Sequence, residues 1–139
     1  MNPNYVALAE FRYQIRQFIR KSEDAARQAG LEPQHHQLLL AIKGAPPGTP
    51  VTVGYLAERL QLRQNSAGEL LDRLVGKGLV RRRRDPADGR RVLIEPSAKA
   101  EAMLHRLTVY HERELKTAGP ALIDAISDAI EAPSRRGSA

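Results

Sequence analysis

The feature that most constrains the fold is an arginine-rich segment, GLVRRRRDPADGRRVLIEPS, at residues 78–97. Four consecutive arginines, Arg81–Arg84, precede an Asp88-Gly89 turn signal, two further arginines and a β-prone run at residues 92–94. This order predicts a β-hairpin over residues 79–95, with the glycine supplying a position that tolerates a positive φ at the tip. Arginine side chains are rarely buried, so six of them on two strands and their tip predict a surface that contacts a polyanion.

Two short helices are expected immediately before the hairpin. Thr52 is a suitable N-cap for a helix over residues 53–60, which a tight turn separates from a second helix over residues 65–77. Val51 and Thr52 could also form one short strand. The second helix has a regular apolar face, formed by Ala67, Leu70, Leu71, Leu74 and Val75. Helix, tight turn, helix and hairpin over residues 52–95 predict a winged helix-turn-helix.

Amphipathic helices are predicted on both sides of this portion, at residues 4–30 and 97–131, with a break at Gly119-Pro120. A core helix beginning at Pro33 completes a three-helix core with a hairpin wing. We therefore expect a mainly α, single-domain fold over residues 1–139, ending in a disordered tail at residues 133–139. The flanking helices carry more apolar surface than the winged portion can cover, which predicts a homodimer interface formed by Leu8, Phe11, Ile15, Leu122, Ile126 and Ile130.

Composition narrows the class of partner. The chain of 139 residues has a formal net charge of +6 and no cysteine, which suggests an anionic partner and excludes disulfides and thiolate metal sites. Aromatic residues make up only 4% of the chain, so stacking platforms for single strands are few and duplex DNA is favoured. No membrane span or signal peptide is evident, and we expect a cytoplasmic protein. Phosphate-binding loops and paired carboxylates at a distinctive spacing are also not evident, so neither an enzyme nor a bound cofactor is expected.

The start of the second short helix is the expected base-reading surface, because the N-terminal part of such a helix enters the major groove. Amides suit adenine and a carboxylate can accept a hydrogen bond from cytosine, whereas arginines suit phosphates. The alternative is a capped, solvated helix start, since Asn and Ser favour helix N-termini. The candidate DNA-binding residues here are Arg63, Gln64, Asn65, Ser66, Glu69 and Arg73.

Strand alternation separates the arginines of the hairpin. Arg82 and Arg84 should lie on one face of the strand, with Arg81 and Arg83 on the other. Because not all four can face the DNA, some of them should pair with Asp85, Asp88 or nearby phosphates. Arg90, directly after the turn, is best placed to reach a minor groove. A solvated charge run is the alternative interpretation. The candidate wing contacts are Arg82, Arg84, Asp88, Arg90 and Arg91.

The motifs of the hairpin resemble those of the MarR family of bacterial transcriptional regulators. That family's wing carries Asp-x-Arg, five residues and Leu-Thr, and here Asp88 and Arg90 match, Ser97 replaces Thr and Pro96 replaces Leu. The layout is similar over about residues 5–131, whereas the specific motif covers only residues 70–97. Because Pro is tolerated in the first turn of a helix, the Pro96 departure affects only the start of the following helix.

The resemblance implies a homodimer on a pseudo-palindromic operator, with Asp88 orienting wing arginines by an ion pair and Arg90 in the minor groove. It also implies a small-molecule effector pocket between the dimerisation and DNA-binding parts, for which Tyr13, Arg16 and His36 are candidates. Adjacent histidines on a helix point about 100° apart, so His35 and His36 do not favour a metal site. A site across helices, with Glu32, His105 and His111, is conceivable, but we expect no bound metal.

The function expected from the sequence is sequence-specific binding of double-stranded DNA by a transcriptional regulator, most simply a repressor relieved by a small-molecule effector. Two alternatives remain open: a winged-helix module that binds an acidic protein, and a non-specific architectural DNA-binding protein.

Overall fold

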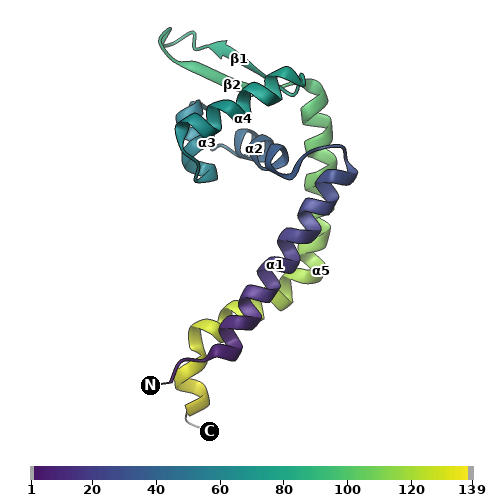
Figure 1. Ribbon diagram of the computed structural model, residues 1–139, viewed down its shortest axis with the longest axis vertical. Coiled ribbons are helices and arrows are strands. Elements are labelled where there is room, and N and C mark those ends of the chain that lie inside the picture. Colours follow the sequence, from purple (N-terminus) through teal and green to yellow (C-terminus); the bar gives the residue numbers. More distant parts are fainter. Residues whose placement is uncertain (1, 138–139) are drawn as a thin grey trace. The chain divides into compact units, whose positions relative to one another are not determined.

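The computed structural model describes residues 2–137, and the side chains of residues 2–131. It contains five helices and one β-hairpin within the described residues: α1 (Tyr5–Gln28), α2 (Pro33–Lys43), α3 (Val53–Leu60), α4 (Gln64–Gly76), β1 (Val80–Arg84), β2 (Val92–Pro96) and α5 (Ala98–Gly137) (Figure 1). The chain divides into two compact units, residues 26–107 and residues 1–25 with 108–139. We call the first the winged unit and the second the helical unit. None of the described helices combines the length and apolar character that crossing a membrane requires.

The winged unit is built on leucines from three helices. The mainly α winged-helix fold expected from the sequence is confirmed, because α2, α3, α4 and the hairpin are all present in the predicted order. The largest side chains with almost no exposed surface are six leucines and one histidine, and burying a leucine contributes about 1.5–3 kcal/mol. These residues are Leu38 and Leu39 of α2, Leu56 of α3, Leu70, Leu71 and Leu74 of α4, and His35.

The connections of the winged unit follow from local backbone chemistry. The hydroxyl Oγ1 of Thr52 accepts a hydrogen bond from the backbone N–H of Tyr55 at 3.2 Å and so caps α3 as expected. The turn between α3 and α4 places Gln61 in the left-handed region, with φ 55°. Gly78 ends the α4 segment with φ 71°, a conformation that an L side chain rarely adopts. The short strand considered at Val51 is not formed, although its carbonyl accepts a 2.8 Å hydrogen bond from the N–H of Ile94 in β2.

Thr52→Ala is expected to lower the free energy of unfolding by about 1 kcal/mol, because the substitution removes the hydroxyl that caps α3. Urea unfolding followed by circular dichroism measures the change. Thr49→Ala provides the matched control, since the described structure holds no side-chain hydrogen bond for Thr49. Equal losses in the two variants would show that the cap at Thr52 contributes nothing specific.

The hairpin pairs β1 with β2 antiparallel, with Val80 opposite Pro96 and Arg84 opposite Val92. Val80 and Ile94 are buried and anchor the hairpin on the core. The expectation of a positive φ at Gly89 was wrong, because that glycine is not among those with positive φ. The tip is instead a loop over residues 85–91, which side-chain hydrogen bonds shape in place of a tight two-residue turn.

The helical unit consists of the N-terminal part of α1 and the C-terminal part of α5, which run antiparallel (Figure 1). His111 Nε2 lies 2.9 Å from Ser22 Oγ, and the rings of His111 and Phe18 meet edge to face. The break expected at Gly119-Pro120 was wrong, because α5 continues through it. Apolar residues on both sides of the pair line one groove with α1, and this packing outweighs the low helix propensity of Gly and Pro.

Helix α5 extends as far as Gly137, while the rest of the tail predicted at residues 133–139 lies outside the described residues.

The helical unit leaves much apolar surface uncovered. Of the residues predicted for a dimer interface, Leu8 (55% exposed), Ile126 (38%) and Ile130 (75%) are exposed, whereas Phe11, Ile15 and Leu122 are half-buried. Most of the other exposed large apolar residues also belong to this unit, among them Tyr5, Val6, Ile19, Val109, Leu115 and Ile123.

Candidate nucleic-acid interface

Helix α4 presents polar side chains at its N-terminal end. The face formed by its alanine and leucines is buried in the core, and this burial fixes which side chains remain outside. The uncovered side chains are the ones that the sequence predicted as base and phosphate contacts: Arg63, Gln64, Asn65, Ser66, Glu69 and Arg73 are all exposed. Gly68 between them adds no side chain, so the helix surface stays open to a close approach.

The alternative interpretation, a capped and solvated helix start, holds only for its solvation. Arg63, rather than Asn65 or Ser66, occupies the N-cap position of α4, and its side chain makes no capping hydrogen bond. Asn65 and Ser66 lie inside the first turn and are exposed. Their amide and hydroxyl groups therefore remain available to an external ligand.

Two arginines on one face of β1 share one carboxylate, that of Glu95. Arg81 Nε donates to Glu95 Oε2 at 3.0 Å, and Arg83 Nε donates to Glu95 Oε1 at 2.5 Å. The two arginines therefore share a face, as strand alternation predicted. The hydrogen bond from Arg83, followed by that from Arg81, lowers the pKa of Glu95 against the opposing effect of desolvation. The carboxylate thus stays charged at neutral pH, and no motif in the sequence marks it as an arginine partner.

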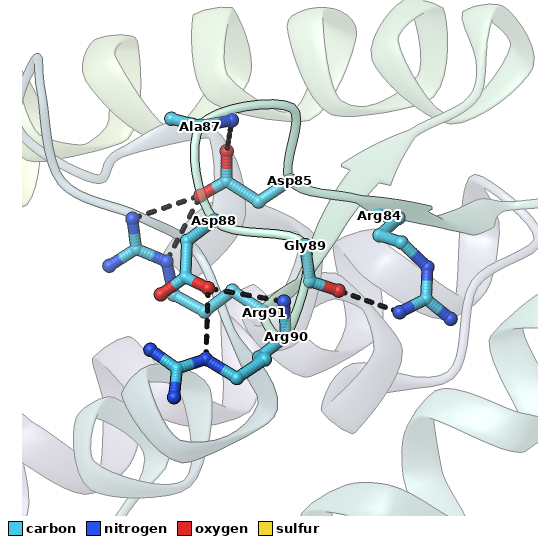
Figure 2. A network of polar contacts seen from close by, with 7 residues as sticks. All are labelled: Arg84, Asp85, Ala87, Asp88, Gly89, Arg90 and Arg91. Atoms are coloured by element: carbon cyan, nitrogen blue, oxygen red, sulfur yellow. Dashed lines mark hydrogen bonds and ion pairs between the residues drawn. The ribbon is translucent and has the colours of Figure 1, made fainter.

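The other two arginines of β1 also have partners within the unit. Arg82 Nη2 donates to Asp72 Oδ1 of α4 at 2.6 Å, which ties the wing to the predicted recognition helix. Arg84 Nη1 donates to the carbonyl of Gly89 across the tip loop at 2.6 Å (Figure 2). Both side chains were predicted as DNA contacts, and each would have to exchange or share a present partner to reach a phosphate.

The tip loop holds two aspartate–arginine pairs of different character (Figure 2). Asp85 Oδ2 accepts from Arg91 Nε at 3.0 Å and lies 2.9 Å from Arg91 Nη2. Asp88 Oδ1 accepts from the backbone N–H of Arg90 at 3.1 Å, but lies 3.5 Å from Arg90 Nε. The side chain of Arg90 is 95% exposed, so it is the least constrained of the six arginines.

Register explains why these partners were difficult to assign from the sequence. Glu95 lies directly opposite Arg81 only because β1 and β2 pair with that particular offset. Asp72 lies on α4, ten positions before Arg82, and its role depends on how the hairpin returns over the helix. Asp85 follows directly after the arginine run and was expected to pair with an arginine, which the contact with Arg91 confirms.

The three residues suggested for an effector pocket do not belong to one unit. Tyr13 and Arg16 are exposed on α1 in the helical unit, where the Tyr13 hydroxyl oxygen accepts a 2.7 Å hydrogen bond from Gln17 Nε2. His36 is buried in the winged unit at 3% exposure. The pocket stays a prediction.

Two histidines, one in each unit, have a polar side chain close to a ring nitrogen. His35 is buried in the core, with Nε2 3.2 Å from Glu32 Oε2, and desolvation lowers the pKa of His35 while the charge of Glu32 acts in the opposite direction. His111 contacts Ser22 in the helical unit. Among the described residues, no three His, Cys, Asp or Glu side chains are grouped as metal ligands would be.

Comparison with known proteins agrees with this geometry. The family model of the MarR family matches residues 29–91, which span α2, α3, α4, β1 and the tip loop. Residues 29–91 belong to the MarR family. No curated protein sequence matches the chain.

Several solved structures have the same fold as this protein. The transcription regulator MepR of Staphylococcus aureus is 19% identical, with 96% of this chain and 95% of that chain covered and a TM-score of 0.70. A MarR family protein from Bacillus stearothermophilus is 22% identical over 84% of this chain and 81% of that one, with a TM-score of 0.69. A mutant MarR from E. coli, solved in complex with operator DNA, is 21% identical over 80% and 75%, with a TM-score of 0.62.

Proposed function

We propose that this MarR-type protein is a transcriptional regulator that binds specific sites in double-stranded DNA as a homodimer, most simply as a repressor. The observation that carries the proposal is the pairing of an exposed polar helix start, Gln64 to Glu69, with an adjacent arginine hairpin whose tip side chain, Arg90, is 95% exposed. An α-helix fits the major groove and an arginine fits a narrow minor groove. Neither group of residues forms part of the core.

Charge supports a polyanionic duplex as the ligand. The chain carries a formal net charge of +6, and six arginines lie between residues 81 and 91. Polyanion binding releases counterions from the duplex, and this release supplies affinity that does not depend on base sequence. Sequence preference would then come from α4, where Gln64, Asn65, Ser66 and Glu69 offer hydrogen-bonding groups to base edges. The E. coli relative bound to operator DNA supports this assignment by its likeness of fold.

Dimerisation is supported by the uncovered apolar surface of the helical unit. Ile123, Ile126 and Ile130 recur at helical spacing and are at least 38% exposed. Large apolar patches on a soluble unit mark association sites, and a two-fold dimer would present two copies of α4 to two half-sites. An effector that prefers a dimer with misplaced α4 helices would lower DNA affinity by that preference.

Selection of bound duplexes from a random pool, followed by footprinting, tests the proposal. The expected result is a pseudo-palindrome whose two half-sites lie about one helical turn apart, each protected sharply. Protection spread uniformly along every duplex would favour an architectural DNA-binding protein. Failure to retain any duplex at low salt would overturn DNA binding and favour a module that binds an acidic protein.

Glu95→Gln is expected to raise the affinity for non-operator duplex by about tenfold and to steepen the salt dependence of log K by about one to two, because it frees Arg81 and Arg83 for phosphates. Fluorescence anisotropy at several salt concentrations measures both quantities. Glu112→Gln, which makes the same charge change on an exposed residue of the helical unit, is the control. Unchanged salt dependence in Glu95→Gln would show that neither arginine reaches the duplex.

A further inference from the structure

We propose that Asp85 is a positioning residue of the wing: it fixes the tip loop through Arg91 and thereby presents Arg90 to DNA. The inference rests on the proposed function and deepens it. The two arginines that follow Gly89 then have different roles. Arg91 is held within the loop by the protein, and Arg90 is the side chain that the loop delivers to the duplex.

The Asp85 carboxylate joins both sides of the tip loop. Its Oδ1 accepts a hydrogen bond from the backbone N–H of Ala87 at 2.9 Å, and its Oδ2 accepts one from Arg91 Nε at 3.0 Å (Figure 2). The contact with Arg91 Nη2, at 2.9 Å, makes the pair two-pronged. The side chain of Asp85 is only 9% exposed, whereas an ordinary surface ion pair is well hydrated and contributes little.

Backbone hydrogen bonds join the two ends of the same loop. The N–H of Asp85 donates to the carbonyl of Arg91 at 2.9 Å, and the N–H of Arg91 donates to the carbonyl of Asp88 at 2.9 Å. Asp85 and Arg91 thus meet through main chain and side chain together. Between them lie residues 86–90, whose backbone is also held by the hydrogen bonds from Arg84 Nη1 to the carbonyl of Gly89 and from the N–H of Arg90 to Asp88 Oδ1. A loop ordered in advance does not have to lose this conformational freedom when it binds.

Arg90 gains its exposure from this arrangement. Its N–H is held by Asp88 Oδ1 at 3.1 Å, while its guanidinium is 95% exposed and keeps only a 3.5 Å contact with the same oxygen. The Asp88–Arg90 pair that the family resemblance suggested is therefore the weaker of the two. Asp88, at 37% side-chain exposure, orients one N–H, whereas Asp85 organises the whole loop.

Electrostatics are consistent with a permanently charged Asp85. The N–H of Ala87, followed by the hydrogen bond and charge of Arg91, lowers the pKa of Asp85 against the opposing desolvation. The carboxylate is therefore ionised throughout the neutral range. Asparagine in its place would retain an acceptor for Ala87 and lose the charge that holds Arg91.

A double-mutant cycle between Asp85 and Arg90 tests the assignment, using the duplex selected by the wild-type protein. Asp85→Asn is expected to weaken binding of that duplex about tenfold. In the Arg90→Ala background the same substitution should weaken binding less than twofold, because Asp85 then has no Arg90 side chain to position. Asp124→Asn, an exposed aspartate of the helical unit, is the charge-matched control. Thermal unfolding of each variant checks that the fold is retained.

Three results would overturn the assignment. They are an equal fold-loss from Asp85→Asn with and without Arg90, no loss at all, and a loss from Asp88→Asn that exceeds the loss from Asp85→Asn. Should Asp85→Asn fail to fold, Arg91→Gln replaces it in the cycle with the same expectations, because the Arg91 side chain is 43% exposed. If the wild-type protein selects no duplex, the proposed function has failed, and this outcome is distinct from wild-type binding that Asp85 does not influence.

Discussion

Ile126→Asp is expected to convert the protein from dimer to monomer at concentrations where the wild type is dimeric. Ile126 is 38% exposed in the single chain, so a charge is tolerated there by the monomer and not by an apolar interface. Fully burying an isoleucine contributes about 1.5–3 kcal/mol, so covering the exposed part of Ile126 contributes about 1 kcal/mol, and a two-fold dimer loses it twice. A total of about 2 kcal/mol raises the dissociation constant about thirtyfold, and the cost of desolvating two carboxylates adds to this. Analytical ultracentrifugation across a concentration series measures it.

Leu40→Asp is the matched control for this substitution. Leu40 lies on α2 of the winged unit and is 41% exposed, so the change in charge and exposure is nearly the same as at Ile126. We expect Leu40→Asp to remain dimeric. A dimeric Ile126→Asp variant would place the interface elsewhere, and a monomeric Leu40→Asp variant would extend it onto α2. Helical content by circular dichroism should match the wild type in both variants.

The winged unit could be predicted from local sequence because several independent signals agreed there. Thr52 caps α3, apolar spacing marks the buried face of α4, and Gly78 takes the positive φ that ends the α4 segment. The strand alternation that placed Arg81 and Arg83 on one face was confirmed by their common partner, Glu95. Each of these features depends on residues close together in the chain.

Features that depend on tertiary packing could not be predicted in the same way. Gly119-Pro120 signals a break by propensity, yet contacts between α1 and both flanking parts of α5 keep the helix continuous. The ion pairs of β1 depend on the register of β1 against β2 and on how the hairpin lies against α4, so Asp72 and Glu95 had no distinctive signature, whereas Asp85 was expected as an arginine partner. The sequence predicted that the arginines would lie on the hairpin, but it did not predict which of them would form ion pairs with carboxylates.

Arg90→Ala is expected to weaken binding of the selected duplex by about 10- to 100-fold, because a well-placed arginine contact is worth roughly 1–3 kcal/mol. Since the side chain is 95% exposed and supports no core contact, the thermal midpoint and the dimer should be unchanged. The salt dependence of log K should fall by about one for each copy bound, as for the loss of one cationic contact. Anisotropy titrations on operator and non-operator duplexes provide all three comparisons.

Arg113→Ala separates a contact at the wing tip from a general loss of charge. Arg113 is an exposed arginine on α5 in the helical unit, so the net charge changes equally while the wing stays intact. We expect Arg113→Ala to bind the selected duplex within twofold of the wild type. Equal losses from Arg90→Ala and Arg113→Ala would mean that overall charge drives binding, whereas wild-type affinity in Arg90→Ala would remove the wing tip from the interface. A loss specific to Arg90 that is similar for operator and non-operator duplexes would leave base recognition to α4, because an arginine in the minor groove responds to groove width more than to base identity.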